Sequence, residues 1–397
     1  MVELARRMNN LGTETAFAVS AEANSFAAEG NKVYPFHLGD LNIKTPTNVV
    51  EAAEKAIASG KTGYCSNYGI PELRKAVAEN VSKSHGIDYT MENVAIQPGG
   101  KPVVAKFLLA LMNPGDEVLY PNPGYPIYES QIEFNGGVAV PYTFEEAENG
   151  FQLDIKTFEK LVTPKTRLLI FNNLQNPTGA ESSHDELEKV AKIACKNNLV
   201  VLCDEAYFDI RYEGKSESLA SFPGMKERSV ILYTFSKKFA MTGWRLGAAI
   251  GPKEVIDAIA KLNVNIESCP NHFIQYGAVE GLKGNQDECR KILAVLKERR
   301  DVAVEILNTI KGVNCHRPHA TFYLYPNVTG LMERIGCKDY TEFRINVLKN
   351  TGVSFCTRMH FGKPLPGEKE KYIRLAYSGI DTGDIVEGLT KLKNFVK

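Results

Sequence analysis

Short runs of β-branched and apolar residues alternate with amphipathic stretches of helical period between about residues 47 and 290. Seven runs are candidate strands: Val94–Gln97, Glu117–Tyr120, Ala139–Tyr142, Leu168–Phe171, Leu199–Cys203, Val230–Tyr233 and Leu246–Ile250. Candidate helices between them include Pro71–Ser84, Asp154–Leu161 and His184–Asn197. Strands joined through helices usually run parallel, with helices on both faces of the sheet. The pattern therefore predicts an α/β fold with a mostly parallel seven-stranded sheet.

The remaining sequence predicts a second, smaller unit. A chain of 397 residues is too long for one typical hydrophobic core. A single long helical pattern, charged on one side, runs from Pro270 to about Lys311, and short strands at Thr321–Leu324 and Tyr372–Ala376 follow among helices. We predict a large domain over 46–290, a small α+β domain over 291–397, and an N-terminal arm over 1–45 that completes the small domain or reaches a partner.

Composition excludes several classes of function. Lys and Arg number 47, as do Asp and Glu, so no electrostatic argument favours a nucleic acid or an anionic membrane as partner. No apolar run approaches the roughly 20 residues that span a bilayer, and the N-terminus lacks the pattern of a signal peptide. The eight cysteines form no CxxC pair, which favours free thiols. We expect a cytoplasmic protein without a metal site.

Polar residues follow four of the predicted strands at the point where each strand ends. They are Pro98-Gly99-Gly100-Lys101, Asn172 to Gly179 (NNLQNPTG), Asp204-Glu205-Ala206-Tyr207 and Thr234-Phe235-Ser236-Lys237. Ligands of open α/β sheets bind beyond the carboxyl ends of the strands. Four such ends with polar groups therefore predict one binding site.

Lys237 is the first candidate for chemistry at this site. A lysine beside a sheet end is partly desolvated, so its amine loses a proton more easily and can form a Schiff base with an aldehyde. The hydroxyls of Thr234 and Ser236 and the guanidinium of Arg245 suit a phosphate dianion. Taken alone, the same residues are also compatible with a solvated turn.

Asp204 follows an apolar strand and needs a partner if it is buried. It can serve as a helix cap or structural ion pair, or it can hold a protonated ring nitrogen, with Tyr207 beside it for a phenolate. Gly99-Gly100 offers backbone amides to an anion at a helix start, although such a pair is often only a turn. Together with Lys237, these groups describe the binding partners of pyridoxal 5′-phosphate (PLP).

The chain resembles the fold-type I, class I/II aminotransferases, near the aspartate aminotransferase group. Six segments carry the resemblance, in the order of that family: Lys61–Tyr64 with Gly69–Arg74, Pro123–Tyr128, Asn176–Gly179, Asp204–Tyr207, Ser236–Arg245 and Tyr372–Leu375. The resemblance covers essentially the whole chain. It implies the type I fold of PLP-dependent transferases, the cofactor PLP and a homodimer with shared active sites.

The resemblance also implies a role for each matching residue. Lys237 would form the Schiff base with the cofactor and then move the substrate proton, Asp204 would keep the pyridine nitrogen protonated, and Tyr207 with Asn176 would bind the ring oxygen. The implied phosphate ligands are Gly99, Gly100, Thr234, Ser236 and Arg245, with the neighbouring Lys101 and with Tyr64 of a second subunit. Tyr125 would stack on the ring. Arg374, aided by Asn176 and the Gly39 backbone, would bind the substrate α-carboxylate.

Side-chain specificity stays open at this point. In the subgroup that the chain resembles, a lysine at the position of Lys101 can bind the distal carboxylate of a dicarboxylic substrate. Lys101 is equally compatible with a solvated first helical turn. Glu14, in the arm, can pair with Lys101 and cancel its charge, attract a substrate amine, or remain solvated.

Three functions are compatible with these residues. The leading one is an aminotransferase that exchanges an amino group between an L-amino acid, aspartate or glutamate first and aromatic donors behind, and a 2-oxo acid by a ping-pong mechanism. The same fold can also act as a β-lyase or a cyclopropane-forming synthase. A non-catalytic PLP-fold protein is the third, and Lys237, Asp204 and Arg374 argue against it.

Overall fold

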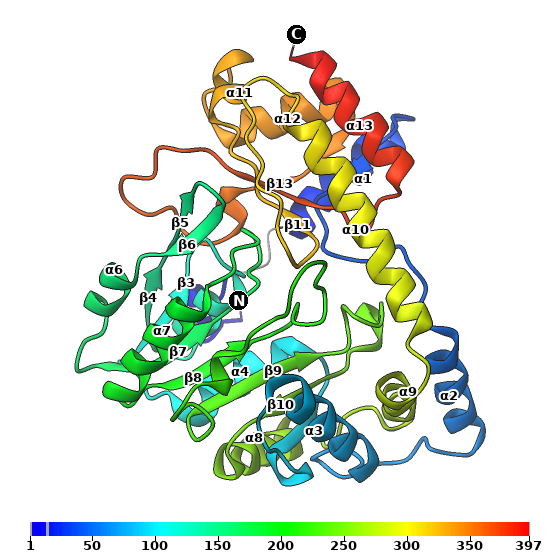
Figure 1. Cartoon of the computed structure of the whole chain (residues 1–397), viewed down its shortest axis with the longest axis vertical. Helices are drawn as coiled ribbons and strands as arrows, with labels where there is room; N and C mark the ends of the chain where they lie inside the picture. Colours follow the sequence, from blue (N-terminus) through cyan, green and yellow to red (C-terminus); the bar gives the residue numbers. More distant parts are fainter. Residues whose placement is uncertain (1, 13–15, 397) are drawn as a thin grey trace.

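A seven-stranded sheet forms the centre of the larger part of the molecule (Figure 1) in the computed structural model, which describes residues 2–12 and 16–396. Its strand order is β2-β10-β9-β8-β7-β3-β4, and only β10 runs antiparallel to its neighbours. The strands are β2 (Val94–Gln97), β3 (Glu117–Pro121), β4 (Val138–Tyr142), β7 (Thr166–Phe171), β8 (Val200–Asp204), β9 (Ser229–Thr234) and β10 (Gly247–Ile250). The predicted mostly parallel seven-stranded sheet is confirmed, with every strand near its expected place.

Helices cover both faces of this sheet. Successive side chains of β8 point to opposite faces, so Leu202 packs in one apolar cluster while Val201 and Cys203 pack in another. The helices on the Leu202 face are α4 (Gly100–Leu111), α5 (Ile127–Phe134) and α8 (Lys253–Ile266). Those on or beside the other face are α2 (Thr47–Ala58), α3 (Pro71–His85), α6 (Ile155–Lys160), α7 (His184–Lys196) and α9 (His272–Lys283). Double coverage explains why the strands read as continuous apolar runs.

A further apolar cluster lies in the upper part of Figure 1 and contains residues from both ends of the chain. Tyr34 and Phe36 pack there with residues from beyond position 290. The strands of this part form one sheet of β11 (Tyr323–Leu324), β14 (Ile373–Ala376) and β13 (Cys356–Thr357), and a pair of β1 (Tyr34–Pro35) and β12 (Val353–Ser354). Its helices are α1 (Ala16–Ala28), α11 (Thr329–Arg334), α12 (Tyr340–Thr351) and α13 (Thr382–Phe395). The domain boundaries stay a prediction; residue 290 lies inside the helix α10 (Asp287–Leu307).

The remaining elements are short. A hairpin of β5 (Phe144–Ala147) and β6 (Gly150–Leu153) stands beside the main sheet. Five 3₁₀ turns complete the described chain: Arg6–Asn10, Met91–Asn93, Leu219–Ser221, Thr242–Trp244 and Arg358–His360.

The single helix expected from Pro270 to Lys311 is wrong, because the structure has two helices there. α9 ends at Lys283, Gly284 is extended, and α10 (Asp287–Leu307) follows. Glycine weakens helix interiors, and the periodic pattern on both sides of it concealed the break. The charged side was also misread: Arg299 is buried and donates to Asn42, Asp381 and the Ser378 carbonyl.

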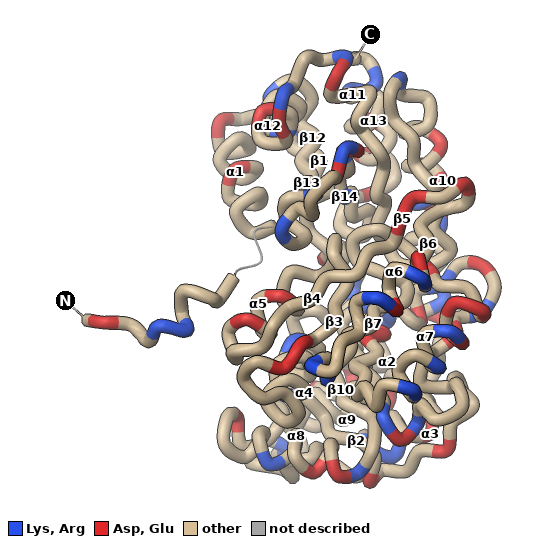
Figure 2. The backbone as a smooth tube through the Cα atoms, turned by 90° about the vertical axis from the view of Figure 1, so that its left-hand side faces the viewer, with Lys and Arg blue, Asp and Glu red and all other residues tan. Residues whose placement is uncertain are grey.

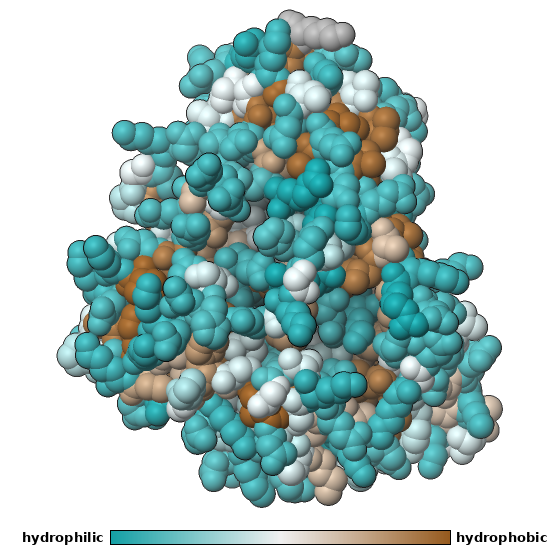
Figure 3. Space-filling model, in the orientation of Figure 1, coloured by the Kyte–Doolittle hydropathy of each residue, from teal (hydrophilic) through white to brown (hydrophobic). Residues whose placement is uncertain are grey.

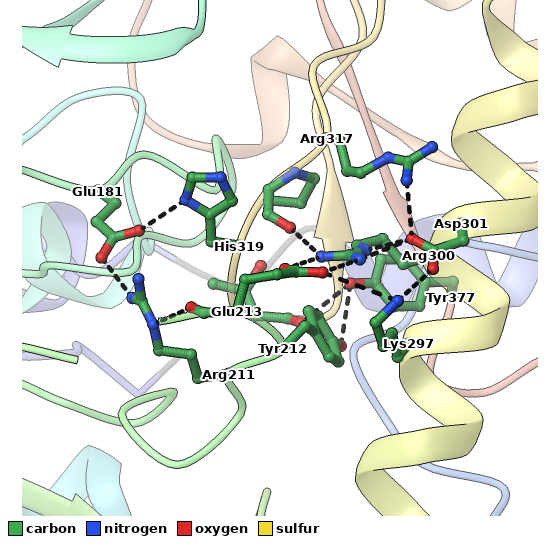
Figure 4. Close-up of polar contacts among 12 residues, drawn as sticks. Glu181, Arg211, Tyr212, Glu213, Lys297, Arg300, Asp301, Arg317, His319 and Tyr377 are labelled. Atoms are coloured by element: carbon green, nitrogen blue, oxygen red, sulfur yellow. Dashed lines mark hydrogen bonds and ion pairs between the residues drawn. The ribbon is translucent and has the colours of Figure 1, made fainter. Parts of the chain in front are cut away.

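Arg300 of α10 is fully buried in a polar network that joins α10 to the loop after β8 (Figure 4). Its guanidinium donates to both carboxylate oxygens of Glu213 at 2.6 and 2.7 Å and to Asp301 at 2.7 and 2.9 Å. It also lies 4.6 Å from the centre of the Tyr212 ring. The same network continues through Lys297 and Arg317 to Asp301. The buried guanidinium is thus paired and hydrogen-bonded, as burial of a charge requires.

The surface is mixed in character. The face shown in Figure 3 is mostly hydrophilic, with scattered apolar patches. Residues 2–12 extend away from the body of the molecule (Figure 2), and Val2 and Leu4 among them are highly exposed. Of the helices within residues 2–12 and 16–396, none is both long and apolar enough to cross a bilayer.

Replacing Arg300 by Met should destabilise the protein by about 2 kcal/mol, because Glu213 and Asp301 lose their buried partner. The cost stays below that of a fully buried pair, since both carboxylates reach water. Lys297→Met is the control: Lys297 is about half exposed, so its loss should change stability by less than about 1 kcal/mol.

The difference between wild type and Arg300→Met should also depend on pH. Arg300 holds the pKa of the Glu213 carboxyl below its usual range. A carboxyl whose pKa is lowered by folding stabilises the protein above its unfolded pKa, and this contribution disappears as the pH falls through the folded value. Melting curves should show the full difference at pH 7 and a smaller one below about pH 4. A difference that is constant or grows on acidification would contradict this assignment.

Candidate active site

A cavity of about 490 Å³ lies at the carboxyl ends of the central strands, below β11 and β14. Twelve of the predicted site residues line it: Gly39, Gly100, Lys101, Tyr125, Asn176, Asp204, Tyr207, Thr234, Ser236, Lys237, Arg245 and Arg374. Gly99 directly precedes Gly100 at the start of α4. Of the others, Tyr64 is 88 % exposed and does not line the cavity, and Glu14 lies outside the described residues.

Lys237 follows β9 and enters the cavity from the sheet side. Its Nζ donates to the Gly39 carbonyl at 3.0 Å. The same ammonium lies 5.2 Å from the Phe322 ring centre and 5.8 Å from that of Tyr207. Aromatic walls around a lysine limit the access of water, which is the environment that an amine nucleophile requires.

Asp204 ends β8 and is buried. Tyr128 donates its hydroxyl to Oδ2 of Asp204 at 2.5 Å, and the Ala206 N–H donates to Oδ1 at 3.1 Å. Burial raises the pKa of Asp204, and these two hydrogen bonds oppose the rise by stabilising the carboxylate. The partner that a buried aspartate needs is therefore Tyr128 of α5. Asn172 donates to the Asp204 carbonyl and fixes the strand end.

The start of α4 and the segment after β9 form an anion-binding corner. Gly99 has φ +101°, and a side chain there would overlap the Arg245 guanidinium. The Arg245 backbone is itself left-handed, with φ +55°, and its Nη1 donates to the Thr242 carbonyl at 2.7 Å. The Thr234 hydroxyl donates to Ser236 Oγ at 3.0 Å. Helix amides, two hydroxyls and a guanidinium together suit a phosphate.

Arg374 on β14 faces this corner from the opposite side of the cavity and is 4 % exposed. It donates to Asn176 Oδ1 at 3.1 Å and to the His37 carbonyl at 2.7 Å. The guanidinium lies between the rings of Tyr323 and Phe361, 4.5 and 4.7 Å from their centres. Its buried Nε has no hydrogen-bond partner within the part of the chain that the structure describes. Such a fixed, partly unsatisfied guanidinium suits a carboxylate.

Sequence reasoning missed several residues of the cavity. Tyr128 lies in a segment that was singled out for Tyr125 alone, although the second tyrosine of Y-P-I-Y was a usable signal. Asn172, directly after β7, was among the polar residues noted at the strand ends but was given no role; it donates to the Asp204 carbonyl. Phe17 of α1, Leu38 and Tyr323 come from segments outside the main sheet, whose approach to the cavity depends on tertiary structure.

The residues present fit PLP. The lysine, the anion corner and the buried aspartate lie in one cavity whose volume is in the usual range for small ligands, roughly 300 to 1,000 Å³. Fold and site thus define a PLP-dependent enzyme of the type that binds its cofactor through a lysine.

Comparison with known proteins agrees with this class. Residues 32–392 match the model of the family "Aminotransferase class I and II". A protein of Aquifex aeolicus named probable aspartate/prephenate aminotransferase is 33 % identical over 395 residues, which cover 98 % of each chain. An asparagine–oxo-acid transaminase of Streptococcus mutans is 32 % identical over the whole of both chains. The chain belongs to the class I and II aminotransferases.

The solved structures include an aspartate aminotransferase of Thermus thermophilus with maleate, which is 30 % identical and has a TM-score of 0.91 over the full length of both chains. The fold is therefore that of the type I PLP-dependent transferases, as the sequence resemblance implied. The protein is a PLP-dependent aminotransferase, and its family works by a ping-pong mechanism in which an amino acid and a 2-oxo acid react in turn.

Proposed function

We propose that the enzyme transfers the amino group of L-aspartate or L-glutamate to a 2-oxo acid. The observation that carries this choice is that Arg374 and Lys101 line one cavity. Two cationic side chains on different elements, β14 and α4, match the two carboxylates of a dicarboxylic substrate. The names of relatives that contain aspartate support the same choice.

Each residue around the cofactor would bind a different part of it. Bound PLP supplies an aldehyde and a protonated ring that withdraws electrons from the substrate Cα. Lys237 would hold the aldehyde carbon through its amine, and once the substrate amine replaces it there, the released amine would act as the base that moves the Cα proton to cofactor C4′. Asp204 keeps the ring nitrogen protonated, and Tyr207 with Asn176 binds the ring oxygen. Tyr125 stacks on the ring.

The phosphate ligands in this proposal are the residues of the anion corner. Gly99 and Gly100 supply backbone amides, Thr234 and Ser236 supply hydroxyls, and Arg245 supplies charge. Lys101 lies beside them, 5.9 Å from the centre of the Tyr125 ring, so its position serves the phosphate side and the substrate side chain alike. Glu14 as a modifier of Lys101 stays a prediction.

Arg374 positions the substrate. Asn176, which accepts from Arg374, aligns the guanidinium for a bidentate contact with the α-carboxylate. The Gly39 carbonyl holds the Lys237 ammonium at 3.0 Å, and Gly39 thus connects the substrate side of the cavity to the lysine. This arrangement brings the Cα proton of a bound amino acid toward the amine.

We further propose a cytoplasmic homodimer in which Tyr64 reaches the phosphate of the neighbouring subunit. Tyr64 is 88 % exposed, and the exposed apolar residues Val2 and Leu4 lie on a segment that extends from the body. Eight free thiols suit a reducing compartment. Sedimentation velocity should give about twice the mass of the chain, and a monomer would contradict the shared site.

Replacing Lys237 by Ala should lower kcat by about 10³-fold or more, because the proton transfer loses its base. The matched control is the next residue. Lys238 pairs with Asp209 at 3.5 Å and does not line the cavity, so Lys238→Ala should retain near-normal turnover. Steady-state assays with aspartate and 2-oxoglutarate measure both variants. Transamination by Lys237→Ala at the wild-type rate would refute the assignment of the base.

Replacing Lys101 by Met should raise KM for aspartate by about tenfold to a hundredfold, the value of a charged hydrogen bond. The amino donor L-alanine has no distal carboxylate and serves as an internal control, so the KM of the Lys101→Met variant for L-alanine should hardly change. The ratio of the two kcat/KM values is the measurement. An equal loss for both donors would move Lys101 from substrate selection to cofactor binding.

A further inference from the structure

Tyr323 contacts residues on both sides of the active-site cavity, Tyr207 on one side and Arg374 on the other. It begins β11, which pairs with β14 so that Tyr323 lies opposite Ala376, two residues from Arg374. Its hydroxyl lies 2.7 Å from the Tyr207 hydroxyl, and its ring centre lies 4.5 Å from the Arg374 guanidinium carbon. Tyr207 follows β8 of the large sheet. One buried side chain therefore contacts the carboxylate-binding arginine of one sheet and the cofactor-facing tyrosine of the other.

The surroundings hold Tyr323 in this position. Gly39 has no side chain, and any side chain there would overlap the Tyr323 hydroxyl. The preceding Thr321 has a left-handed backbone with φ +69°, which is unfavourable for a β-branched residue. Its carbonyl accepts hydrogen bonds from the hydroxyls of Tyr212 at 2.6 Å and Tyr377 at 3.0 Å.

These two tyrosines belong to the Arg300 network shown in Figure 4, where Arg300 packs on the Tyr212 ring. The strained residue before β11 is thus fixed by buried hydrogen bonds that are anchored on α10. Such strain persists only where the surrounding structure holds it, and it is concentrated at functional sites. The network supports the exact segment that carries Tyr323.

We propose that Tyr323 is a positioning residue that donates its hydroxyl proton to Tyr207 and supports Arg374 with its ring. The proposal rests on the proposed function, because it takes Tyr207 as the ligand of the cofactor oxygen and Arg374 as the ligand of the α-carboxylate. Each contact has a separate consequence: the hydroxyl acts on the cofactor, and the ring acts on the substrate.

The direction of the hydrogen bond follows from counting protons. Burial keeps the pKa of Tyr207 well above its usual range, so Tyr207 is neutral and has one proton to donate. If that proton is directed to the cofactor oxygen, the bond between the two tyrosines must come from Tyr323. A donated hydrogen bond makes Tyr207 a stronger donor in turn. Tyr323 thereby favours the negatively charged form of the cofactor oxygen.

Tyr323→Phe removes the hydroxyl and keeps the ring. The visible absorption of the PLP-loaded protein, titrated with pH in the absence of substrate, should shift its midpoint upward by about half a unit to one unit. KM for the amino donor should stay within about twofold, because the ring beneath Arg374 remains. Tyr325→Phe is the matched control, since the buried Tyr325 hydroxyl has no hydrogen-bond partner among the described residues and should not move the midpoint. An unchanged or lowered midpoint in Tyr323→Phe, or the same shift in both variants, would overturn the proposal.

Tyr323→Leu removes the ring as well, and should raise KM for the amino donor at least about fivefold above that of Tyr323→Phe. Equal KM values in the two variants would overturn the role of the ring.

Tyr212→Phe tests whether the hydrogen bonds to Thr321 hold Tyr323 in place, and it changes no residue of the cavity. It removes one hydrogen bond to the Thr321 carbonyl, and should shift the midpoint of the absorption titration in the same direction by a smaller amount. A wild-type protein that binds PLP and titrates, but does not react with aspartate or glutamate, would refute the proposed donors and leave the titration test of Tyr323 valid.

Discussion

The parallel register of β7, β8 and β9 is the constraint on which the site depends. Phe171 lies opposite Cys203, and Asp204 lies opposite Leu232, so the residues that follow these strands reach the same edge of the sheet. Both faces of the sheet are covered by helices, and a polar group can leave the apolar interior only at that edge. The buried carboxylate at the end of β8 then needs a donor, which Tyr128 provides from α5. The sheet thus fixes the groups that we propose as cofactor ligands, and α5 provides the hydrogen bond that the buried Asp204 needs.

Charge is divided between the two sides of the cavity. The sheet side holds Asp204 and Arg245, while Arg374 enters from the small sheet. Each charged group is held by backbone carbonyls or amides near it, such as the Thr242 carbonyl on Arg245 and the His37 carbonyl on Arg374. Groups that are oriented before a ligand arrives require little reorganisation when it binds, which is the main source of electrostatic catalysis in enzymes.

The strands of the main sheet and the polar residues at their ends depend on local pattern, so the sequence was sufficient for them. Gly39, Tyr125 and Arg374 were predicted only through the resemblance to a known family. Continuous apolar runs mark doubly covered strands, and polar residues at their ends mark the site. The break between α9 and α10 was missed because the helical pattern continues across Gly284. Arg299 was read as part of the charged side of the helical pattern, because burial of an arginine depends on partners far away in the chain, such as Asp381. Arg300 was not singled out, since its partner Glu213 is also distant in the chain. Tyr323 carried no local signal for the same reason.

Residues at the strand ends of the main sheet could be predicted from local pattern, and residues such as Tyr323 could not, for a physical reason. Groups on the ends of β8 and β9 inherit their positions from one sheet, so their chemistry can be read along the chain. Arg374 and Tyr323 belong to a separate sheet, and their distance from the cofactor side depends on how the two sheets are held together. Contacts between the two parts include the hydroxyl pair of Tyr207 and Tyr323, the contact of Arg374 with Asn176 and the hydrogen bonds from Arg300 to Glu213. Proton transfer requires the substrate Cα and Lys237 to be aligned closely, and small misplacements are costly. The side chains that span the two sheets therefore determine how accurately a bound carboxylate aligns the reacting atoms.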